Sequence, residues 1–488
     1  MKFLIDTNIF IPLEPASTTD LQAVTPVATE FVQLIFKAGH QLYVHPTVRV
    51  DIQRDVNDER IKLRELLLNK YPCLPNPPNI PSWLEDILGH AEPKTNDWVD
   101  HHLIAALAAD AVDFLVTEDR RLRQKAKRVN LHNRVVTAAE ALSIIEDLFD
   151  TTPVPPPAVR NVKAHVLNAD DPIFQSFRED YPNFDEWLKK CKREHRQTWI
   201  IEGKHSRLAA ICIVKQEKDV NFGLVGKILK ICSFKVSEEY NGFRFGELLL
   251  KTVFTYANTN NYNWIYVTVL EKHNELIELL EDFGFQKVGS QTELGEVVLT
   301  KPMLFTEAER DSLEPLAFNI RYGPFAVKVV GVPIFIIPIR PRYHRFLFPE
   351  AEEQLELIPG TLTFGNSIRK AYLSNAAIRT ITPGANLLFY RSEDISSVTA
   401  LGVVEDTLVS SSPIVIANYV GKRTVYRFTE IEELCQKEVL AILFRQSRIL
   451  NNPISLNELR TNSVLAAAPQ SILTVPEEIT QWLQTRLN

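Results

Sequence analysis

The chain has 488 residues, which predicts two to four domains, since single domains usually hold about 100 to 200 residues. Hydrophobic residues make up 45% and charged residues 24%, a globular composition that excludes a chain disordered throughout. With 54 basic and 61 acidic side chains the net charge is −7, which excludes a general cationic surface, so any nucleic-acid site must be local.

Signals for other compartments are weak. The five cysteines are scattered without a CxxC pair, which argues against a disulfide framework or a structural zinc site and favours a reducing cytoplasm. The N-terminal apolar run is too short for a signal peptide. The apolar stretch from Val327 to Ile339 is interrupted by Gly331 and Pro333, well short of the roughly 20 residues that span a bilayer. We therefore predict a soluble, cytoplasmic protein without a membrane partner.

Proline and glycine divide the chain. Residues 151–160 form a Pro-rich linker in extended geometry. A polar helical stretch and Gly323-Pro324 make residues 304–325 a connector. The predicted domains are therefore 1–150, 161–303 and 326–488. The first holds 16 basic against 22 acidic side chains and so carries −6, whereas the third carries +1.

Residues 1–150 alternate short apolar runs with helical patterns, which predicts a parallel sheet flanked by helices. Two buried strands each lead into an aspartate, namely Asp6 after the first and Asp119 after a late one. Open parallel sheets bind ligands beyond the carboxyl ends of their strands. We therefore expect Asp6 and Asp119 to meet at one edge.

Two predicted helices place further acids near their starts. Pro46-Thr47 opens the helix that carries Asp51, and Thr95 opens the helix that carries Asp97 and Asp100 on one face. Each acid alone could be a helix cap or a surface charge. Several carboxylates in one site repel one another, however, and a hard divalent cation, Mg²⁺ or Mn²⁺, usually binds there and offsets the repulsion.

With these motifs in place, residues 1–150 resemble the PIN-domain ribonucleases: an opening FLIDTNIF, DHHLIAALA with an acid at its head, and LVTED on a late strand. The resemblance implies an α/β/α fold with Thr7, Asn8 and Thr117 supporting the site. It implies four catalytic acids, Asp6, Asp51, Asp100 and Asp119, and metal binding by Asp6, Asp100, Asp119 and Asp97. Glutamate is commoner than Asp51 at the second position, so Asp55 and Glu30 stay open as alternatives.

Directly after Asp119 comes a run with six basic residues in nine, from Arg120 to Arg128. Arg120, Arg121 and Arg123 are therefore candidates for nucleic-acid phosphate contacts beside the predicted metals. The alternative is an ordinary solvated helix face.

Residues 161–303 contain strand-like runs at Trp199, Arg207 and Gly226, then a glycine-containing turn before a helix start near Gly246. Unpaired backbone N–H groups and the helix dipole at such a turn hold a pyrophosphate. The segment is similar to the GNAT acetyltransferases, an α+β fold that binds acetyl-CoA. The resemblance implies cofactor contacts from Val236, Asn241, Gly242, Phe243, Arg244, Phe245, Gly246 and Asn274.

Two positions depart from that family. Arg244 replaces a glycine of the pyrophosphate loop and either crowds or binds the phosphate, and Leu280 stands where many members have a tyrosine acid. Whether this domain turns over acetyl-CoA or is a degenerate scaffold stays open at this point.

Residues 326–488 combine short strands with Pro-Gly turns, which predicts a small β-barrel. PGANLLFY, ALGVV and the closing FRQ and PQSI elements resemble the PUA-like superfamily, near its ASCH and EVE branches, which implies RNA or modified-base binding. Its candidate nucleic-acid contacts are Arg340, Arg342, Tyr343 and Arg345. The alternative for this cluster is a solvated strand edge.

The leading interpretation is a multidomain α/β protein acting as a Mg²⁺- or Mn²⁺-dependent endoribonuclease. Its other domains would select or modify an RNA, with tRNA as first candidate, in a toxin–antitoxin or stress setting. An antitoxin protein and a second copy of the chain are further candidate partners. The alternative is an acetyl-CoA-dependent N-acetyltransferase whose PIN-like domain is inactive or clamps RNA. A third hypothesis is an RNA- or nucleotide-sensing scaffold without catalysis.

Overall fold

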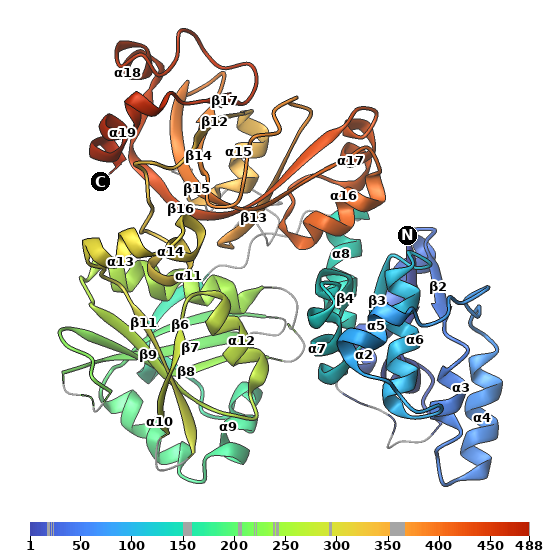
Figure 1. Ribbon diagram of the computed structural model, residues 1–488. Coiled ribbons are helices and arrows are strands. Elements are labelled where there is room, and N and C mark those ends of the chain that lie inside the picture. Colours follow the sequence, from blue (N-terminus) through green and yellow to red (C-terminus); the bar gives the residue numbers. More distant parts are fainter. Residues whose placement is uncertain are drawn as a thin grey trace.

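The computed structural model of the chain describes residues 1–16, 20, 22, 24–149, 159–203, 207–218, 220, 222–237, 240, 244–291, 295–351 and 367–487. It contains three sheets (Figure 1). We call the segments that hold them the N-terminal unit (residues 1–149), the middle unit (159–303) and the C-terminal unit (326–487). The predicted linker lies almost wholly outside the described residues, and the domain boundaries themselves stay predictions.

The N-terminal sheet is parallel, in the order β2-β1-β3-β4. Phe3 of β1 pairs with Leu42 on one side and with Phe114 on the other. Because the central strands are buried on both faces, their sequences are uninterrupted apolar runs. The strands are β1 (Lys2–Ile5), β2 (Gln41–Val44), β3 (Phe114–Val116) and β4 (Val135–Val136).

Alternate strand residues face two different cores. Phe3 and Ile5 belong to one apolar cluster, and Leu4 belongs to another with residues of α6 and α7. Helices thus cover both faces of the sheet. They are α1 (Thr7–Leu13), α2 (Thr25–Lys37), α3 (Val48–Ile52), α4 (Asp58–Leu68), α5 (Ser82–Leu88), α6 (Asn96–Ala108), α7 (Arg120–Arg128) and α8 (Ala138–Phe149).

The middle unit is a seven-stranded mixed sheet in the order β10-β11-β9-β8-β7-β6-β5. Only β8 and β9 pair in parallel. The strands are β5 (Val159–Lys163), β6 (Gln197–Glu202), β7 (Leu208–Glu217), β8 (Ile228–Val236), β9 (Trp264–Leu270), β10 (Gln286–Gln291) and β11 (Glu296–Pro302). One face packs on α10 (Phe184–Arg193), preceded by α9 (Gln175–Asp180), and the other on α11 (Phe245–Thr259) and α12 (Asn274–Asp282).

Two short helices, α13 (Glu307–Ser312) and α14 (Pro315–Tyr322), lead to the C-terminal unit. Thr306 and Glu309 form a capping box that starts α13. The C-terminal sheet has the order β13-β16-β15-β14-β12-β17. Its strands are β12 (Ile334–Ile339), β13 (Arg369–Ser374), β14 (Asn386–Arg391), β15 (Ser397–Ser410), β16 (Val439–Ser455) and β17 (Leu473–Thr474).

The predicted closed barrel is not found. Within the described residues no pairing joins β13 to β17, the two ends of the strand order, so the sheet is open. Its helices are α15 (Pro341–Leu347), α16 (Pro413–Val420), α17 (Phe428–Leu434), α18 (Leu456–Thr461) and α19 (Thr480–Leu487). The long strands β15 and β16 place their register shifts between Val398 and Asp406, and such bulges bend a sheet without closing it.

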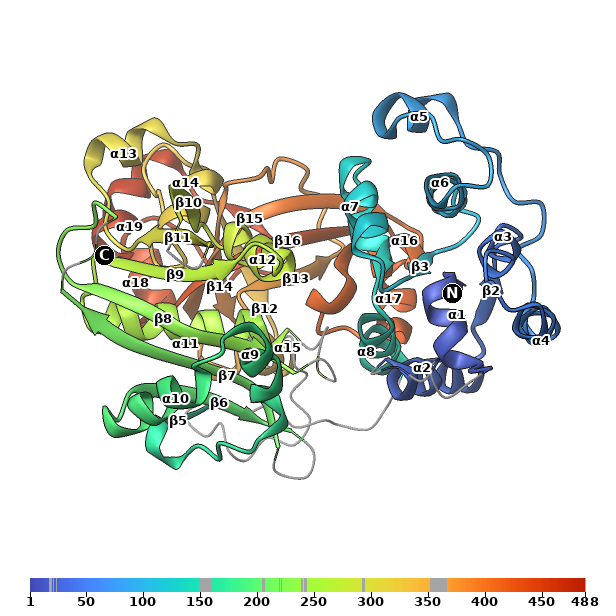
Figure 2. The ribbon, with the colours of Figure 1, turned by 90° about the horizontal axis from the view of Figure 1, so that it is seen from below.

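The N-terminal unit also packs against the C-terminal unit. A single apolar cluster contains Phe31 and Ile145 together with Ile416 and Ile431. Figures 1 and 2 show α8 beside α16 and α17, whereas α7 extends toward α12 of the middle unit. Among the described helices, none has the length and apolar character needed to cross a membrane.

Candidate functional site

The structure brings the N-terminal acids to the carboxyl edge of the parallel sheet. Asp6 caps α1, and its carboxylate accepts hydrogen bonds from the Thr7 N–H (2.6 Å), Asn8 Nδ2 (2.6 Å) and Thr117 Oγ1 (2.8 Å). Thr117 Oγ1 also accepts the N–H of Asp119 (2.9 Å). The three supporting side chains therefore contact the acids as the resemblance implies.

The other acids lie around Asp6. Thr7 Oγ1 donates to Asp51 Oδ2 (2.9 Å), whereas Glu30 is exposed on α2 and Asp55 is ion-paired with Arg60 and Arg64. This geometry favours Asp51 over its two alternatives. Burial raises the pKa of Asp6 to about 7, with Asp100 and Asp51 adding to the rise. Burial likewise raises the pKa of Asp100 to about 6, with Asp119 and Asp97 contributing.

A lysine supplies a positive charge at this edge. Lys125 Nζ lies 2.5 Å from Asp97 Oδ1 and 2.7 Å from Asp100 Oδ2. Within the described residues no group of three or more His, Cys, Asp or Glu side chains is arranged to hold a metal ion. The predicted Mg²⁺ or Mn²⁺ site is thus not seen in the geometry of the described residues, and Lys125 lies beside two of the acids predicted to bind the metal. The catalytic roles of the four acids stay predictions.

The predicted nucleic-acid contacts of α7 face the middle unit in part. Arg120 and Arg123 approach Glu275 of α12 at 3.3 and 3.6 Å, and Lys127 approaches Glu278 at 3.8 Å. Arg121 is exposed. The basic run is therefore an interdomain contact as well as a candidate surface.

The second predicted cluster lies on helix α15 and not on a strand edge. Arg342 pairs with Glu430 (2.9 Å), and Tyr343 donates to the same carboxylate (3.2 Å). Arg340 caps the helix and Arg345 lies in its last turn. Whether this cluster contacts nucleic acid stays a prediction.

A large cavity opens where two strands of the middle unit separate. β8 and β9 pair from Ile228↔Trp264 to Ile231↔Val267, and beyond these pairs β8 continues to Val236 and β9 to Leu270. The cavity has a volume of about 1030 Å³ and is lined by both diverging ends. Ligand pockets usually measure about 300 to 1,000 Å³, so it is large enough for an extended cofactor.

Five of the predicted cofactor contacts line this cavity: Val236, Arg244, Phe245, Gly246 and Asn274. The other three, Asn241, Gly242 and Phe243, lie outside the described residues. A Cβ on Gly246 would lie 3.0 Å from Leu279 Cδ2 and 3.9 Å from Val236 Cγ2. Only glycine therefore leaves this part of the cavity open.

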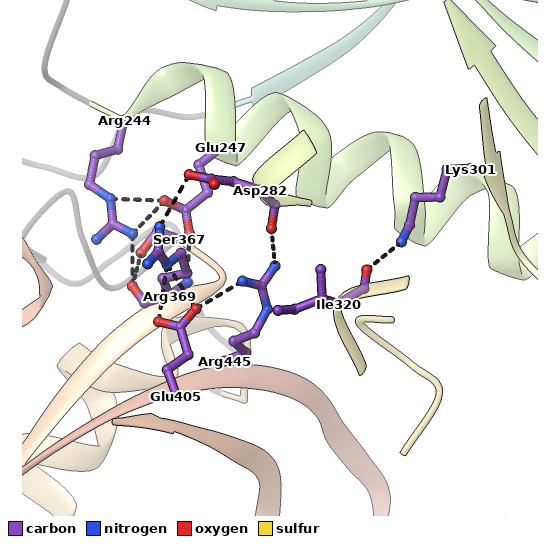
Figure 3. A network of polar contacts seen from close by, with 9 residues as sticks. All are labelled: Arg244, Glu247, Asp282, Lys301, Ile320, Ser367, Arg369, Glu405 and Arg445. Carbon is purple, nitrogen blue, oxygen red and sulfur yellow. Dashed lines mark hydrogen bonds and ion pairs between the residues drawn. The ribbon is translucent and has the colours of Figure 1, made fainter. Parts of the chain in front are cut away.

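Arg244 turns its side chain toward the C-terminal unit (Figure 3). Its Nε donates to Glu247 Oε2 (2.9 Å) and its Nη2 to the Arg369 carbonyl (2.8 Å). Arg369 N–H in turn donates to Glu247 Oε1 (2.5 Å). Burial alone would raise the pKa of Glu247, but Arg244 and Arg369 outweigh it and lower that pKa. Arg244 thus anchors the helix start rather than crowding it.

The structure also shows polar residues that the sequence analysis missed. His273 Nε2 lies 2.7 Å from Asp180 Oδ2, and Tyr181 donates to Glu296 Oε1 (2.9 Å). All four line the cavity, and Asp180 and Glu296 are largely buried. Their one sequence signal is the position of His273 directly before Asn274, because Asp180 and Glu296 are far from it along the chain. Leu280, by contrast, is buried in the apolar core.

One buried hydroxyl in the cavity wall lacks a partner. Ser233 of β8 is 5% exposed, and its Oγ makes no hydrogen bond with the described residues. An orphaned donor at this depth is satisfied when a polar ligand fills the cavity. Together with the open space at Gly246, it fits a cofactor that has both apolar and polar groups.

Comparison with known proteins gives one family match. Residues 163–285, about a quarter of the chain, match the acetyltransferase (GNAT) family. The match does not extend to residues 1–150. A search of curated proteins gave no match. The middle unit therefore contains a GNAT acetyltransferase domain.

Several solved structures are remotely similar to this chain, each over less than a third of its length. One is the ASCH protein from Zymomonas mobilis, with 14% identity over 31% of this chain and 94% of that chain and a TM-score of 0.25. A GNAT acetyltransferase from Staphylococcus aureus Mu50 has 13% identity over 30% and 100%, with a TM-score of 0.24. Nourseothricin acetyltransferase has 19% identity over 22% and 64%, with a TM-score of 0.19.

Proposed function

We propose that the protein is an acetyl-CoA-dependent N-acyltransferase that works in the cavity between β8 and β9. The observation that carries this proposal is the separation of the two parallel strands after Ile231 and Val267, inside the segment that matches the GNAT family. Acetyl-CoA, when bound, supplies the acetyl group as a thioester. The described residues that would hold it are Val236, Phe245, Gly246, Asn274 and the Ser233 hydroxyl.

His273 is the side chain best placed to take a proton from the acceptor. An amine is mostly protonated at neutral pH and must lose a proton before it can attack. With the ring proton on Nε2 and donated to Asp180, Nδ1 carries the free lone pair. The Asp180 carboxylate then stabilises the imidazolium that forms.

The lining around this pair favours a cationic acceptor. The carboxylates of Asp180 and Glu296 face the cavity together with the rings of Phe177, Tyr181 and Trp187. Carboxylates and aromatic faces both attract cations. We therefore propose a primary amine that carries a positive charge in solution.

Binding of acetyl-CoA is tested by calorimetry on the full chain. Gly246→Trp fills the space beside Leu279 and is expected to lower the affinity at least about 100-fold, since a pocket cannot absorb an indole without strain. Gly289→Trp is the matched control, because an added Cβ there meets nothing within 4 Å. A wild-type chain that does not bind acetyl-CoA excludes the proposal.

Catalysis is tested by thiol release with a panel of primary amines. His273→Gln is expected to lower kcat about 100-fold, the usual effect of losing a general base, while acetyl-CoA affinity stays unchanged. Lys272→Gln is the control, because Lys272 pairs with Asp180 but does not line the cavity. Equal losses in both variants would assign the effect to Asp180 alone.

A second candidate function is endoribonuclease activity of the N-terminal unit, with RNA and an antitoxin protein as partners. It is supported by the convergence of Asp6, Asp51 and Asp100 on one sheet edge. The described residues present no metal-holding group, so we derive no reaction step there.

This candidate predicts a specific pH dependence. Because the pKa of Asp6 is about 7 and a metal ligand must be deprotonated, Mn²⁺ affinity should rise between about pH 6 and 8 in the wild type and not in Asp6→Asn. Calorimetry with Mn²⁺ and a tRNA cleavage assay measure this, with the exposed Glu30→Gln as control. Equal cleavage by wild type and Asp6→Asn removes the candidate.

A further inference from the structure

Basic side chains from two neighbouring units line the cavity of the middle unit. Lys127 of α7 and His132 of the 3-10 turn η2 (His132–Arg134) come from the N-terminal unit. Arg369 of β13 and Arg423 of the turn η10 (Gly421–Arg423) come from the C-terminal unit. We call these four residues the junction cluster, because they line the cavity where the three units meet.

The carboxylates near the junction cluster are already occupied. Glu405 accepts Arg369 Nε (2.9 Å) and Arg445 Nη1 (2.8 Å), and Glu247 is held by Arg244 and the Arg369 N–H (Figure 3). Arg423, in contrast, makes no hydrogen bond or ion pair with any residue in the described part of the chain. Lys127 approaches Glu278 at 3.8 Å and Arg369 pairs with Glu405, so Arg423 is the member of the cluster whose charge no ion pair in the described residues neutralises.

The basic side chains of the cluster also shift one another's pKa. Burial and the charge of Arg369 together lower the pKa of Arg423 to about 9, against the opposing charge of Glu405. Burial lowers the pKa of His132 as well, with Arg423, Lys127 and Arg369 as the next causes and Asp282 opposing them. Like charges gathered in a partly enclosed space repel, and a bound anion relieves that repulsion.

We propose that the junction cluster binds the phosphate groups at the nucleotide end of coenzyme A, so that all three units complete the cofactor site. The inference rests on the proposed acyltransferase function. Arginine is the side chain suited to phosphate, because its planar fork donates several hydrogen bonds to one group. The cluster shares one cavity with Val236 and Gly246, which favours a small ligand that spans the cavity over a nucleic acid that would remain outside it.

The test compares coenzyme A with dephospho-coenzyme A, which lacks the 3′-phosphate, by calorimetry on the full chain. Arg423→Gln and Lys127→Gln are each expected to lower the affinity for coenzyme A about tenfold or more, the usual effect of losing a charge-assisted hydrogen bond. Losses seen with coenzyme A alone identify the 3′-phosphate, and equal losses with both ligands identify the pyrophosphate. Lys127→Gln keeps the test informative if Arg423→Gln fails to fold, because half of the Lys127 side chain is exposed.

Salt and matched controls separate binding from damage to the fold. The difference between wild type and variants should shrink as salt rises from about 0.05 to about 0.5 M, because screening weakens a charge contact and leaves a packing defect unchanged. Arg121→Gln, on the same helix but outside the cavity lining, should bind like wild type.

Three outcomes overturn the inference: unchanged affinity in both variants, a loss that salt does not reduce, or a loss of RNA binding with coenzyme A affinity intact. The last outcome, measured with a short RNA oligonucleotide, would assign the cluster to nucleic acid. A wild-type chain that binds no coenzyme A overturns the proposed function instead, so the two failures are distinguishable.

Discussion

The middle unit meets its two neighbours through contacts of different kinds. Toward the C-terminal unit, Glu247 of α11 accepts the N–H of Arg369 on β13. Arg369 and Arg445 both pair with Glu405 of β15, which completes a largely buried network (Figure 3). Toward the N-terminal unit, the ion pairs join side chains of α7 and α12 that are between 31% and 58% exposed. Buried charge pairs are costly to break, whereas exposed pairs contribute about 0 to 1 kcal/mol.

This difference indicates which wall of the cavity is held rigidly by its neighbouring unit. The C-terminal unit holds the start of α11 in place, and the N-terminal unit covers the cavity from the far side through weak contacts. The N-terminal unit is held mainly by its apolar contact with the C-terminal unit. We therefore expect the opening between α7 and α12 to adjust to ligands while the base of the cavity does not.

The largest expected effect comes from removing the carboxylate of the C-terminal unit that holds the two arginines of the buried network. Glu405→Gln leaves Arg369 and Arg445 without their shared carboxylate and should lower the free energy of unfolding by about 3 to 5 kcal/mol. Guanidinium denaturation measures this. Glu281→Gln removes an exposed pair with Lys287 and should change stability by less than about 1 kcal/mol. A loss in Glu405→Gln no larger than in the control would contradict the comparison.

A fall in pH should also distinguish the buried network from the exposed ion pairs. Burial would raise the pKa of Glu405, but Arg369 and Arg445 outweigh it and lower the pKa from 4.5 to about 2. The stabilisation is therefore complete above pH 4.5 and is lost as the pH falls toward 2, about 3 kcal/mol in all. Stability measured against pH should show this decline in the wild type and a flatter curve in Glu405→Gln. Parallel curves would show that Glu405 titrates normally.

The smallest effect is expected on the exposed side. Glu275→Gln removes the partner of Arg120 and Arg123 and should change the free energy of unfolding by about 1 kcal/mol or less. That change should disappear in salt of about 0.5 M. Hydrogen exchange of α7 should quicken slightly, while that of β13 stays the same. A salt-resistant loss above about 2 kcal/mol would mean that this interface is as firm as the other.

Much of the fold follows from sequence patterns. Apolar runs of the right length predicted β1, β3, β8 and β9, and Thr95 marked the start of α6 because a threonine side chain caps the first turn. The prediction of a closed C-terminal barrel was wrong, because a pattern of short strands and turns does not indicate whether a sheet closes. Closure depends on the pairing of its two edge strands, which lie far apart in the sequence.

The site was predictable only where it is local. Val236 ends β8, and Gly246 and Asn274 lie in the first turns of α11 and α12, so local patterns indicated these residues, which line the cavity. The contact of His273 with Asp180, in contrast, joins residues 93 positions apart. The junction cluster is less visible still, because Lys127 and Arg423 belong to different units. The catalytic set around Asp6 stays a prediction, and no spacing rule indicated that Lys125 would contact both Asp97 and Asp100.

The hydrogen bond from the Arg369 N–H to Glu247 has a practical consequence. It ties the first turn of α11 to a residue 122 positions further along the chain, so the segment that matches the GNAT family is not a self-contained cassette. A fragment limited to residues 163–285 would keep Arg244 but would leave Glu247 Oε1 without the N–H of Arg369. Transplanting that segment into another protein should therefore give poor solubility and a distorted helix start, and any working transplant must carry β13 with it.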